Sequence, residues 1–466
     1  MSTARGRVLV YGLGVSGVAT ARRLRDEGLT VVAADDDAGE APRERARELG
    51  MGLHTAPGPA ELENLARTVD EIVVSPGVPA HHRVFSLGAA VPVVGEVELA
   101  WRRARCPVVA VTGSNGKTTV TTLVQAMLKA SGRRAVAAGN IGLPLLDAVA
   151  GDAEVVVAEV SSFQLALTTT FRPAVGAWLN FSPDHLDWHG TVDAYRAAKA
   201  RLWANCGPGD VAVANAEDAV VMAEVAAPRA RGATVVTFGL GDGDYAWRHG
   251  ALAGPGGAVV AALATVPRRM PHDLVDAACA TATALVAGAT PEGCARALAR
   301  FRGLPHRVQL VGEANGVRFY DDSKATTPGA VLAALAGFDR AVLIAGGRNK
   351  GLDLSVLAGA ADRLGAVVAV GEAADDVAGA FAGTTTVLRA SSMADAVGQA
   401  AAAAGPGDAV VLSPGCASFD WYGSYAERGD DFARCVARLA GFEAAAPIPA
   451  GGDAGVTGTA GSGPAR

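Results

Sequence analysis

The stretch Thr112-Gly113-Ser114-Asn115-Gly116-Lys117-Thr118-Thr119 joins two apolar segments of different periodicity. Residues 107–111, before it, form a short β-branched run that predicts a buried strand. After it, apolar residues recur at positions 120, 123, 124, 127 and 128, which is the spacing of an amphipathic helix. A strand, a glycine loop and a helix start in this order are typical of a triphosphate site, because the loop N–H groups and the helix N-terminus face the phosphates.

The residue types of this loop predict how it holds ATP. We expect Gly113–Thr119 to surround the phosphates, with Lys117 neutralising charge and Thr118 ligating Mg²⁺. The full pattern G-x-x-x-x-G-K-[ST] requires glycine at position 111, where the chain has Val111, so only the shorter T-G-x-x-G-K-T is matched. The alternative is a glycine turn without a ligand. The flanking strand and helix favour the ATP site.

Composition excludes several classes of protein. The 466 residues predict about three domains. No apolar stretch reaches the ~18 residues of a membrane helix, and the first residues lead into a strand rather than a signal peptide, so we expect a cytoplasmic protein without membrane insertion. A net charge of −6 without a basic patch argues against nucleic-acid binding. Six scattered cysteines without a C-x-x-C pair predict reduced thiols.

The alternation of strand and helix patterns predicts an α/β fold of three domains. We expect a Rossmann-like domain over residues 1–103, a P-loop ATPase-type domain over 104–303, and a second Rossmann-like domain over 304–445. The Gly-rich stretch 239–260 predicts turns and β structure within the central domain. Residues 446–466 are almost free of bulky apolar side chains and are predicted to be a disordered tail.

The N-terminal domain begins with a G-x-G-x-x-G motif at Gly12, Gly14 and Gly17. Asp35 follows the strand 30–34, close to the acidic position of a dinucleotide fingerprint. The motif alone indicates a tight strand-to-helix turn near an anion. One hypothesis is therefore a nicotinamide dehydrogenase built on these residues, but it leaves the phosphate loop unexplained.

Acidic and basic side chains follow the strands of the central domain. Glu159 ends the strand 153–158, where a carboxylate can hold magnesium beside a triphosphate. The segment 180–189 contains Asp184, His185 and Asp187 after another strand, and suits metal or phosphate chemistry, although an ordinary polar turn is the alternative. Lys199 lies on the apolar stripe of a helix, where an unpaired ammonium is costly. It can extend to solvent, pair with a carboxylate, or lose its proton and form a carbamate with CO₂.

Three loops of the C-terminal domain follow apolar strands, at residues 321–326, 346–351 and 413–420. They should open on one edge of the sheet, where such folds bind ligands. Their lysines, hydroxyls and backbone donors suit an anionic substrate. Cys416 lies in the third loop, but no histidine there would activate it, so we interpret it as a packing residue.

Taken together, the motifs resemble the Mur ligase superfamily, the ATP-dependent amide ligases of peptidoglycan precursor synthesis. The similarity runs from Val8 to about Phe442. Shared features are the phosphate loop, residues 139–142, 159–165 and 184–187, and Lys199. Residues 303–307, 322–326, 346–350 and 413–418 are similar to the members that add D-glutamate to UDP-N-acetylmuramoyl-L-alanine. The Asp-Asn-Pro-Arg signature of the members that add a diamino acid is absent.

The resemblance implies roles for single residues and no nicotinamide. Lys117, Thr118 and Glu159 would serve ATP and a first Mg²⁺, while His185 and a CO₂-derived carbamate on Lys199 would hold a second. ATP would also contact Asp276, Arg307 and Asp322. The residues implied for the UDP-substrate are Gly14, Val15, Ser16, Asp35, Gly77 and Asn140. Those implied for D-glutamate are Lys324, Thr326, Lys350, Ser418 and Tyr425. We expect a monomer.

One departure and two rivals remain. At residues 272–276 the chain has His-Asp-Leu-Val-Asp where the family usually has H-N-x-x-N, so Asp276 stands in place of an adenine-contacting asparagine. A folate-polyglutamate ligase of the same superfamily would share the phosphate loop and differ in substrate. A nucleotide-dependent binding protein would bind ATP without ligase chemistry.

Overall fold

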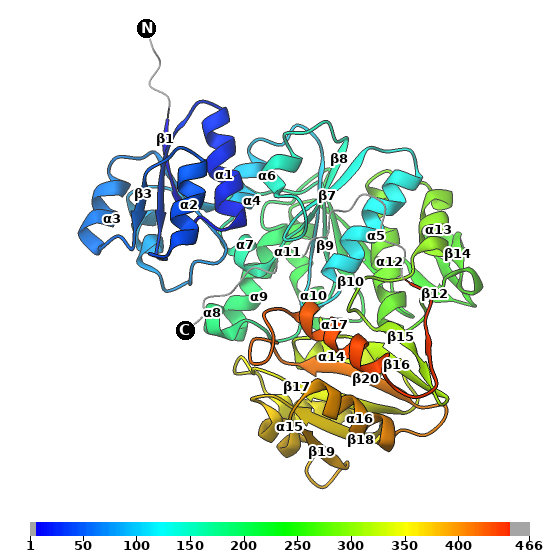
Figure 1. Cartoon of the computed structure of the whole chain (residues 1–466). Coiled ribbons are helices and arrows are strands. Elements are labelled where there is room, and N and C mark those ends of the chain that lie inside the picture. Colours follow the sequence, from blue (N-terminus) through cyan, green and yellow to red (C-terminus); the bar gives the residue numbers. More distant parts are fainter. Residues whose placement is uncertain (1–5, 448–466) are drawn as a thin grey trace.

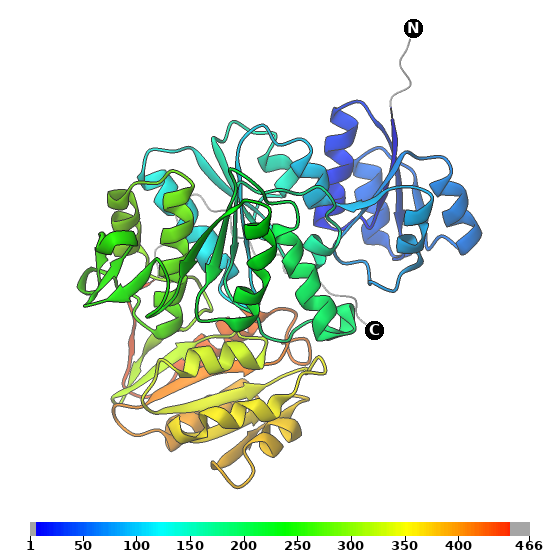
Figure 2. The ribbon, with the colours of Figure 1, turned by 180° about the vertical axis from the view of Figure 1, so that it is seen from behind.

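The computed structural model describes residues 6–447, which form three α/β domains. Figures 1 and 2 show the N-terminal domain and the C-terminal domain on different sides of the central one. The sheets lie within the three ranges expected from the sequence, and the exact domain limits stay a prediction. Of the tail predicted over 446–466, all but the first two residues lie outside the described part of the chain.

The N-terminal domain is a five-stranded parallel sheet in the order β3-β2-β1-β4-β5. Its central strands are apolar runs whose side chains are buried on both faces, as a sheet covered by helices requires. The elements are β1 Arg7–Tyr11, α1 Val15–Asp26, β2 Thr30–Asp35, α2 Glu40–Glu48, β3 Leu53–Thr55, α3 Pro59–Ala66, β4 Glu71–Val74, η1 Arg83–Ala89, β5 Val93–Gly95 and α4 Glu96–Trp101.

The central domain has a six-stranded parallel sheet in the order β11-β10-β9-β6-β8-β7. The strand that enters the phosphate loop, β6, is fully buried between two neighbours, so the loop opens at the centre of the sheet edge. The elements are β6 Val108–Thr112, α5 Lys117–Ala130, β7 Ala135–Gly139, α6 Leu145–Ala148, β8 Val155–Glu159, α7 Ser162–Ala166, β9 Val175–Trp178, α8 Leu186–His189, α9 Val192–Ala200, η2 Arg201–Trp203, β10 Val211–Asn215, α10 Ala219–Glu224, α11 Ala226–Ala230 and β11 Thr234–Phe238.

A small antiparallel sheet and two helices complete the central domain. The Gly-rich stretch forms the sheet, as predicted, and α12 and α13 pack against α5. Thr290 caps α13 as expected, because its hydroxyl accepts the Gly293 N–H at 3.1 Å and Pro291 is the first helical residue. The elements are β12 Ala246–Arg248, β13 Ala251–Ala253, η3 Pro255–Gly257, β14 Val259–Ala262, η4 Leu263–Thr265, α12 Pro271–Val286 and α13 Pro291–Arg300.

The C-terminal domain is a seven-stranded sheet in the order β19-β18-β17-β20-β16-β15-β21. Its central strands β17, β20 and β16 are parallel, so their three following loops do open on one edge, as predicted. The elements are β15 Gln309–Ala314, β16 Val317–Asp321, α14 Pro328–Leu335, β17 Ala341–Gly346, η5 Leu354–Arg363, β18 Leu364–Val370, α15 Ala374–Ala380, β19 Val387–Ala390, α16 Met393–Ala403, β20 Ala409–Gly415, α17 Tyr425–Val436 and β21 Phe442–Ala444.

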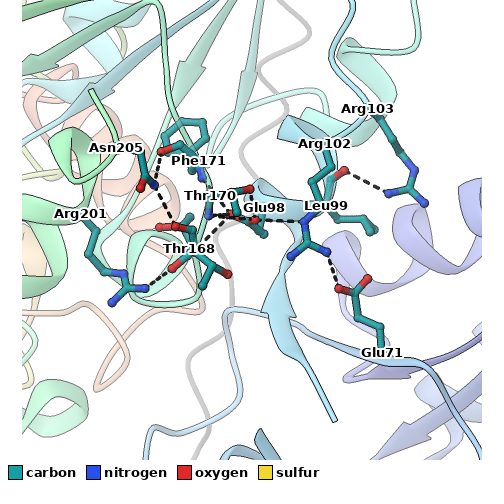
Figure 3. A network of polar contacts seen from close by, with 11 residues as sticks. Glu71, Glu98, Leu99, Arg102, Arg103, Thr168, Thr170, Phe171, Arg201 and Asn205 are labelled. Atoms are coloured by element: carbon teal, nitrogen blue, oxygen red, sulfur yellow. Dashed lines mark hydrogen bonds and ion pairs between the residues drawn. The ribbon is translucent and has the colours of Figure 1, made fainter. Parts of the chain in front are cut away.

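A buried carboxylate joins the first two domains (Figure 3). The side chain of Glu98, on α4, accepts the N–H groups of Thr169, Thr170 and Phe171 and the Thr170 hydroxyl. It also pairs with Arg102 at 3.0 Å. Burial alone would raise the pKa of Glu98, but these donors outweigh it and the pKa is lowered. The helix that ends the N-terminal domain is thus fixed to the central domain by Glu98 and also by Glu96, whose Oε1 accepts the Leu146 N–H at 3.2 Å.

All six cysteines are free thiols. Within residues 6–447, no helix combines the length and apolarity needed to cross a membrane.

Candidate active site

The phosphate loop needs glycine at its last position. Gly116 precedes α5 with φ +80°, which is left-handed backbone. A Cβ there would also lie only 2.4 Å from the Asp276 Oδ1. Both conformation and space therefore exclude a larger residue, and the helix N-terminus is left open toward the loop.

Neighbouring strands fix the loop in place. The Asn115 N–H donates to the Asn180 side-chain oxygen at 2.9 Å, and the Asn180 amide donates back to the Asn115 carbonyl at 3.2 Å. The Ser114 hydroxyl donates to the Ser182 carbonyl at 2.8 Å. The segment 180–182 after β9 thus holds the phosphate loop in one conformation. A fixed loop keeps its backbone amides directed at one point, as binding of an anion requires.

Two lysines, buried Lys199 and half-buried Lys117, donate to carbonyls of the same loop. Lys117 Nζ donates to the carbonyls of Gly113 and Ser114, both at 2.9 Å, and Lys199 Nζ donates to the Gly113 carbonyl at 2.7 Å. Lys199 is only 1% exposed, so its side chain does not extend to solvent. Burial, followed by repulsion from Lys117, lowers the pKa of Lys199 well below its usual range. A neutral amine at this position is the form that reacts with CO₂.

Glu159 offers a free oxygen beside the loop. It ends β8, directly next to Val111 of β6, and its side chain is buried. Its Oε1 accepts the Asn140 amide at 2.9 Å, while Oε2 is buried without a hydrogen-bond partner. An unpartnered buried carboxylate oxygen is costly unless a cation or donor reaches it. This oxygen therefore fits a Mg²⁺ ligand, and Asn140 orients the carboxylate.

His185 lies at a strained turn on the other side of the loop. Its φ of +53° puts it in left-handed backbone, and its ring is 3.2 Å from the Asp184 carboxylate. Burial, followed by the positive charges of Lys350 and Lys117, lowers the pKa of His185 to about 3. The imidazole is therefore neutral at physiological pH, which is the state that ligates a metal.

Only some of the ligands expected for the two Mg²⁺ ions are conventional His or carboxylate side chains. No cluster of three or more His, Cys, Asp or Glu side chains suited to a metal occurs in residues 6–447. The expected set instead includes the Thr118 hydroxyl and a modified lysine, which such a cluster would not contain. The free Glu159 oxygen and the neutral His185 ring are compatible with it.

The C-terminal domain reaches the phosphate loop directly. Arg307 donates to the Thr118 hydroxyl at 2.8 Å, across the boundary between the two domains. A cavity of about 380 Å³ lies beside this contact. It brings together many of the residues predicted for ATP: Asn115, Gly116, Thr119, Asp276, Arg307 and Asp322. The carboxyl of Asp322 accepts the Ser413 hydroxyl at 2.8 Å, and burial raises its pKa to about 7.

Residues predicted for the amino acid lie at the same domain boundary. Lys324 also lines the cavity, and its Nζ is 3.7 Å from the centre of the Tyr425 ring. Burial, followed by repulsion from Arg307, lowers the pKa of Lys324 to about 7. Lys350 is close enough to Asp184 and His185 to act on their pKa values, so it faces the central domain. Ser418 is buried and Thr326 is half-buried, and their roles stay predictions.

The N-terminal motif forms a tight turn. Gly12 has φ +88°, and a Cβ on Gly17 would lie 1.8 Å from the Gly12 carbonyl. The Asp35 carboxylate accepts the Leu13 N–H at 2.6 Å, so it closes the turn. The remaining residues predicted for the UDP-substrate are exposed or half-buried around this turn: Gly14, Val15, Ser16 and Gly77. Their contacts with substrate stay predictions.

Two residues that sequence reasoning left out support the site. Arg428, on α17, is buried and donates to the Ser323 hydroxyl at 2.9 Å and to the Cys416 carbonyl at 3.2 Å, so it ties two of the ligand loops together. Tyr195 lies 3.1 Å from the Ser114 hydroxyl. Arg428 lies on the apolar face of its helix, as Lys199 does on its own. This pattern could have indicated a buried functional charge from the sequence.

The fold and the site define a three-domain P-loop nucleotide-binding protein whose C-terminal domain completes the site. Comparisons with protein families are more specific. Residues 6–95 match the Mur ligase MurD-like N-terminal domain, residues 111–262 the Mur ligase middle domain, and residues 306–416 the Mur ligase glutamate ligase domain.

Curated relatives agree over almost the whole chain. The UDP-N-acetylmuramoylalanine--D-glutamate ligase of Frankia casuarinae is 43% identical over 92% of this chain and 93% of its own length. The enzyme of the same name from Desulfosudis oleivorans is 42% identical over 94% and 98%. MurF from Acinetobacter baumannii shares the fold with a TM-score of 0.59 at 17% identity, covering 92% of this chain and 91% of that one. The chain belongs to the Mur ligase family.

Proposed function

We propose that this protein is an ATP-dependent ligase that joins D-glutamate to UDP-N-acetylmuramoyl-L-alanine in peptidoglycan precursor synthesis. Two relatives named for this activity are 42–43% identical to the chain, and the similarity covers nearly their whole length. The observation on which the proposal depends is the phosphate loop, with Lys117 and Lys199 on its carbonyls and a free Glu159 oxygen beside it. That arrangement suits transfer of a phosphoryl group.

The reaction needs an activated acid, because a carboxylate does not react with an amine at neutral pH. The alanyl carboxylate attacks the γ-phosphorus of ATP, the bond to the β-phosphate oxygen breaks, and ADP leaves. The product is an acyl phosphate. The amine of D-glutamate then attacks the acyl carbon, and inorganic phosphate leaves with the former carboxylate oxygen. One proton is released from the ammonium of the amino acid in each turnover.

The residues of this chain have separate tasks in these steps. Lys117 and the loop amides hold the triphosphate in position for in-line transfer. Arg307 reaches the same loop from the C-terminal domain, so the acyl phosphate would form between two domains and away from bulk water. Bound Mg²⁺ would spread the charge of the phosphoryl transfer, held at one position by Thr118 and Glu159 and at a second by His185 and Lys199.

A carbamate on Lys199 is part of the proposal. The amine is buried and its pKa is lowered well below the usual range, which favours the uncharged, nucleophilic form. Addition of CO₂ gives N–COO⁻ and releases one proton. The new anion would add to the negative charges of Glu159 and Asp184, which act on Lys117, in compensating this lysine and the metals.

The substrates are assigned to the domains as the sequence motifs indicate. The turn at Gly14 and Ser16 would bind the UDP group, with Asn140 near the acceptor. Lys324, Lys350 and Tyr425 would surround the carboxylates of D-glutamate, and the position of Lys324 Nζ 3.7 Å from the centre of the Tyr425 ring supports this assignment. We further propose that the protein acts in the cytoplasm as a monomer.

A phosphate-release assay tests the proposal. Purified protein receives Mg-ATP with UDP-N-acetylmuramoyl-L-alanine or a folate as acceptor, and a panel of D- and L-amino acids as donors. We expect phosphate release only with the UDP-sugar and D-glutamate together. Release that depends on a folate would support the folate ligase instead. ATP binding without substrate-stimulated phosphate release would support a nucleotide-dependent binding protein. Binding of NAD, measured by calorimetry, would support the dehydrogenase hypothesis.

A further inference from the structure

Trp188 forms a hydrogen bond between the central and N-terminal domains. It lies on α8, directly after the segment that carries Asp184 and His185, and Figures 1 and 2 show α8 next to the N-terminal domain. The Trp188 indole N–H donates to the Val78 carbonyl at 3.1 Å. Val78 lies in the loop that follows β4, 110 residues earlier in the chain. A side chain of the central domain thus holds a loop of the first domain.

The loop that Trp188 holds lies where the N-terminal sheet is suited to bind a ligand. The strand order β3-β2-β1-β4-β5 reverses between β1 and β4, because the chain adds strands first on one side of β1 and then on the other. Such sheets bind ligands at the carboxyl ends of the strands that flank this point. Those ends carry the turn at Gly12 and residues 75–78, which together form the ligand edge of this domain. The sheet topology therefore favours a ligand between them, where the UDP-substrate is expected.

Ser75 joins the two parts of the ligand edge. Its hydroxyl donates to the Gly12 carbonyl at 2.6 Å, and its N–H donates to the Tyr11 carbonyl at 2.9 Å. The Val78 N–H in turn donates to the Ser75 carbonyl at 3.1 Å. A displacement of Val78 would therefore also disturb the turn at Gly12, so the indole of Trp188 acts on the whole ligand edge.

Trp188 is also fixed to the turn that carries His185. The Trp188 backbone N–H donates to the His185 carbonyl at 3.1 Å. The Phe163 ring contacts both side chains, and its centre is 5.1 Å from that of the Trp188 ring and 4.6 Å from that of the His185 ring. Lys117 and Lys199 act on the pKa of His185, so this turn lies beside the phosphate loop. Trp188 therefore connects the ligand edge to the surroundings of the phosphate loop.

We propose that Trp188 is a positioning residue for the UDP-substrate. It holds the ligand edge of the N-terminal domain so that the carboxylate of the bound acceptor extends to the phosphate loop. This inference rests on the proposed function, because it takes the acceptor to bind at that edge. Without the indole N–H, residues 75–78 would occupy other conformations as well, and a smaller fraction of molecules would be ready to bind the acceptor. The bound carboxylate would also be less well aligned with the γ-phosphate, which lowers kcat.

The test uses calorimetry with UDP-N-acetylmuramoyl-L-alanine alone and with Mg-ADP alone. Trp188→Phe keeps an aromatic ring next to Phe163 and removes the donor. We expect its Kd for the acceptor to rise about fivefold, as the loss of one net hydrogen bond predicts, and its Kd for Mg-ADP to stay at the wild-type value. A folded Trp188→Phe with an unchanged Kd for the acceptor overturns the proposal, and so does an equal loss of affinity for both ligands.

Trp247→Phe is the matched control. The Trp247 indole N–H donates to the Leu274 carbonyl at 2.8 Å, a bond of the same kind that lies inside the central domain. Its removal should leave the Kd for the acceptor unchanged, and a rise equal to that of Trp188→Phe would contradict a special role of Trp188. Failure of the proposed function gives a different result, because the wild type itself then binds no acceptor, and this outcome overturns both proposals.

The Trp188 indole gives a second readout that a purely structural contact would not change. The chain has six tryptophans, and the Trp188 signal is the indole N–H signal that is missing from the ¹⁵N NMR spectrum of Trp188→Phe. It should shift when the acceptor saturates the wild type, because the ligand packs against the loop that this indole holds. In the phosphate-release assay, Trp188→Phe should show a raised KM for the acceptor and a lower kcat, with the KM for ATP unchanged. A signal that stays in place on acceptor binding, or an unchanged kcat and KM, overturns the proposal.

Discussion

At the scale of single residues, the site depends on groups whose ionisation is changed by burial. Lys199 and Lys117 share the Gly113 carbonyl, and the charge of Lys117 adds to burial in lowering the pKa of Lys199. Glu159 keeps one oxygen free beside them. These residues make the region around the phosphate loop sensitive to small changes in charge, because the effective dielectric constant there is low.

Removing the Lys199 amine should abolish ligase activity. We expect Lys199→Ala to lower kcat at least about a hundredfold, because the proposed carbamate would be a metal ligand and such a ligand supplies several kcal/mol of transition-state stabilisation. High bicarbonate should not restore activity, since no amine remains to form the carbamate. The phosphate-release assay measures this, with the exposed Lys129→Ala on α5 as control. Near-normal turnover of Lys199→Ala would remove this residue from the mechanism.

Asp322 should make stability depend on pH. Its folded pKa of about 7 exceeds the unfolded value of 3.8, so between these values the folded state binds more protons. The free energy of unfolding should therefore fall as pH rises through this window, by up to a few kcal/mol. Below about pH 4 both states are protonated and the contribution levels off.

Urea unfolding of the C-terminal domain between about pH 4 and about pH 8 measures this slope. Asp322→Asn should lose that part of the pH dependence, because an amide does not titrate in this range. The same slope in both proteins would show that other groups cause it.

At the scale of elements, capping and periodicity decide where helices begin. Residues 120–128 predicted the helix α5, and Thr290 with Pro291 predicted the start of α13, because both signals lie within a few residues of sequence. The contact of Lys199 with Gly113 joins residues 86 positions apart, and that of Arg428 with Ser323 joins residues 105 apart. Such contacts depend on how the sheets stack, so periodicity could indicate the buried charges but not their partners.

The contribution of the α13 cap to the free energy of unfolding can be measured with two variants of Thr290. Thr290→Ala removes the hydroxyl that accepts the Gly293 N–H and should lower the free energy of unfolding by about 1 kcal/mol. Thr290→Ser keeps the hydroxyl and should remain within about 0.5 kcal/mol of the wild type. Chemical denaturation of the three proteins gives both differences. Equal losses in the two variants would assign the effect to the methyl group.

At the scale of the whole molecule, polar contacts of single charged residues cross both domain boundaries, and an apolar cluster also joins the first two domains. Glu98 fixes the N-terminal domain to the central one, and Arg307 links the central and C-terminal domains. The sequence predicted three domains because their strand and helix patterns repeat. It did not predict either link, since each joins residues far apart in the chain, as the ion pair and hydrogen bonds of Glu98 illustrate (Figure 3).

Neutralising the Glu98 anchor should loosen the first domain. Glu98→Gln leaves one acceptor where several donors converge and should cost about 3 kcal/mol, seen as an earlier calorimetric transition and faster proteolysis between residues 95 and 108. Glu71→Gln is the matched control, because Glu71 also pairs with Arg102 but is partly exposed, and it should cost about 1 kcal/mol or less. Similar losses for the two variants would contradict a special role for Glu98.

The position of Arg307 has a consequence for the order of events. The same domain carries Arg307, which donates to Thr118 of the phosphate loop, and Lys324 with Tyr425, which we propose to bind the amino acid. Any ligand that draws one of these groups inward also delivers the other. The affinities for the two small molecules must then be coupled, and by thermodynamic reciprocity each strengthens the other by the same factor.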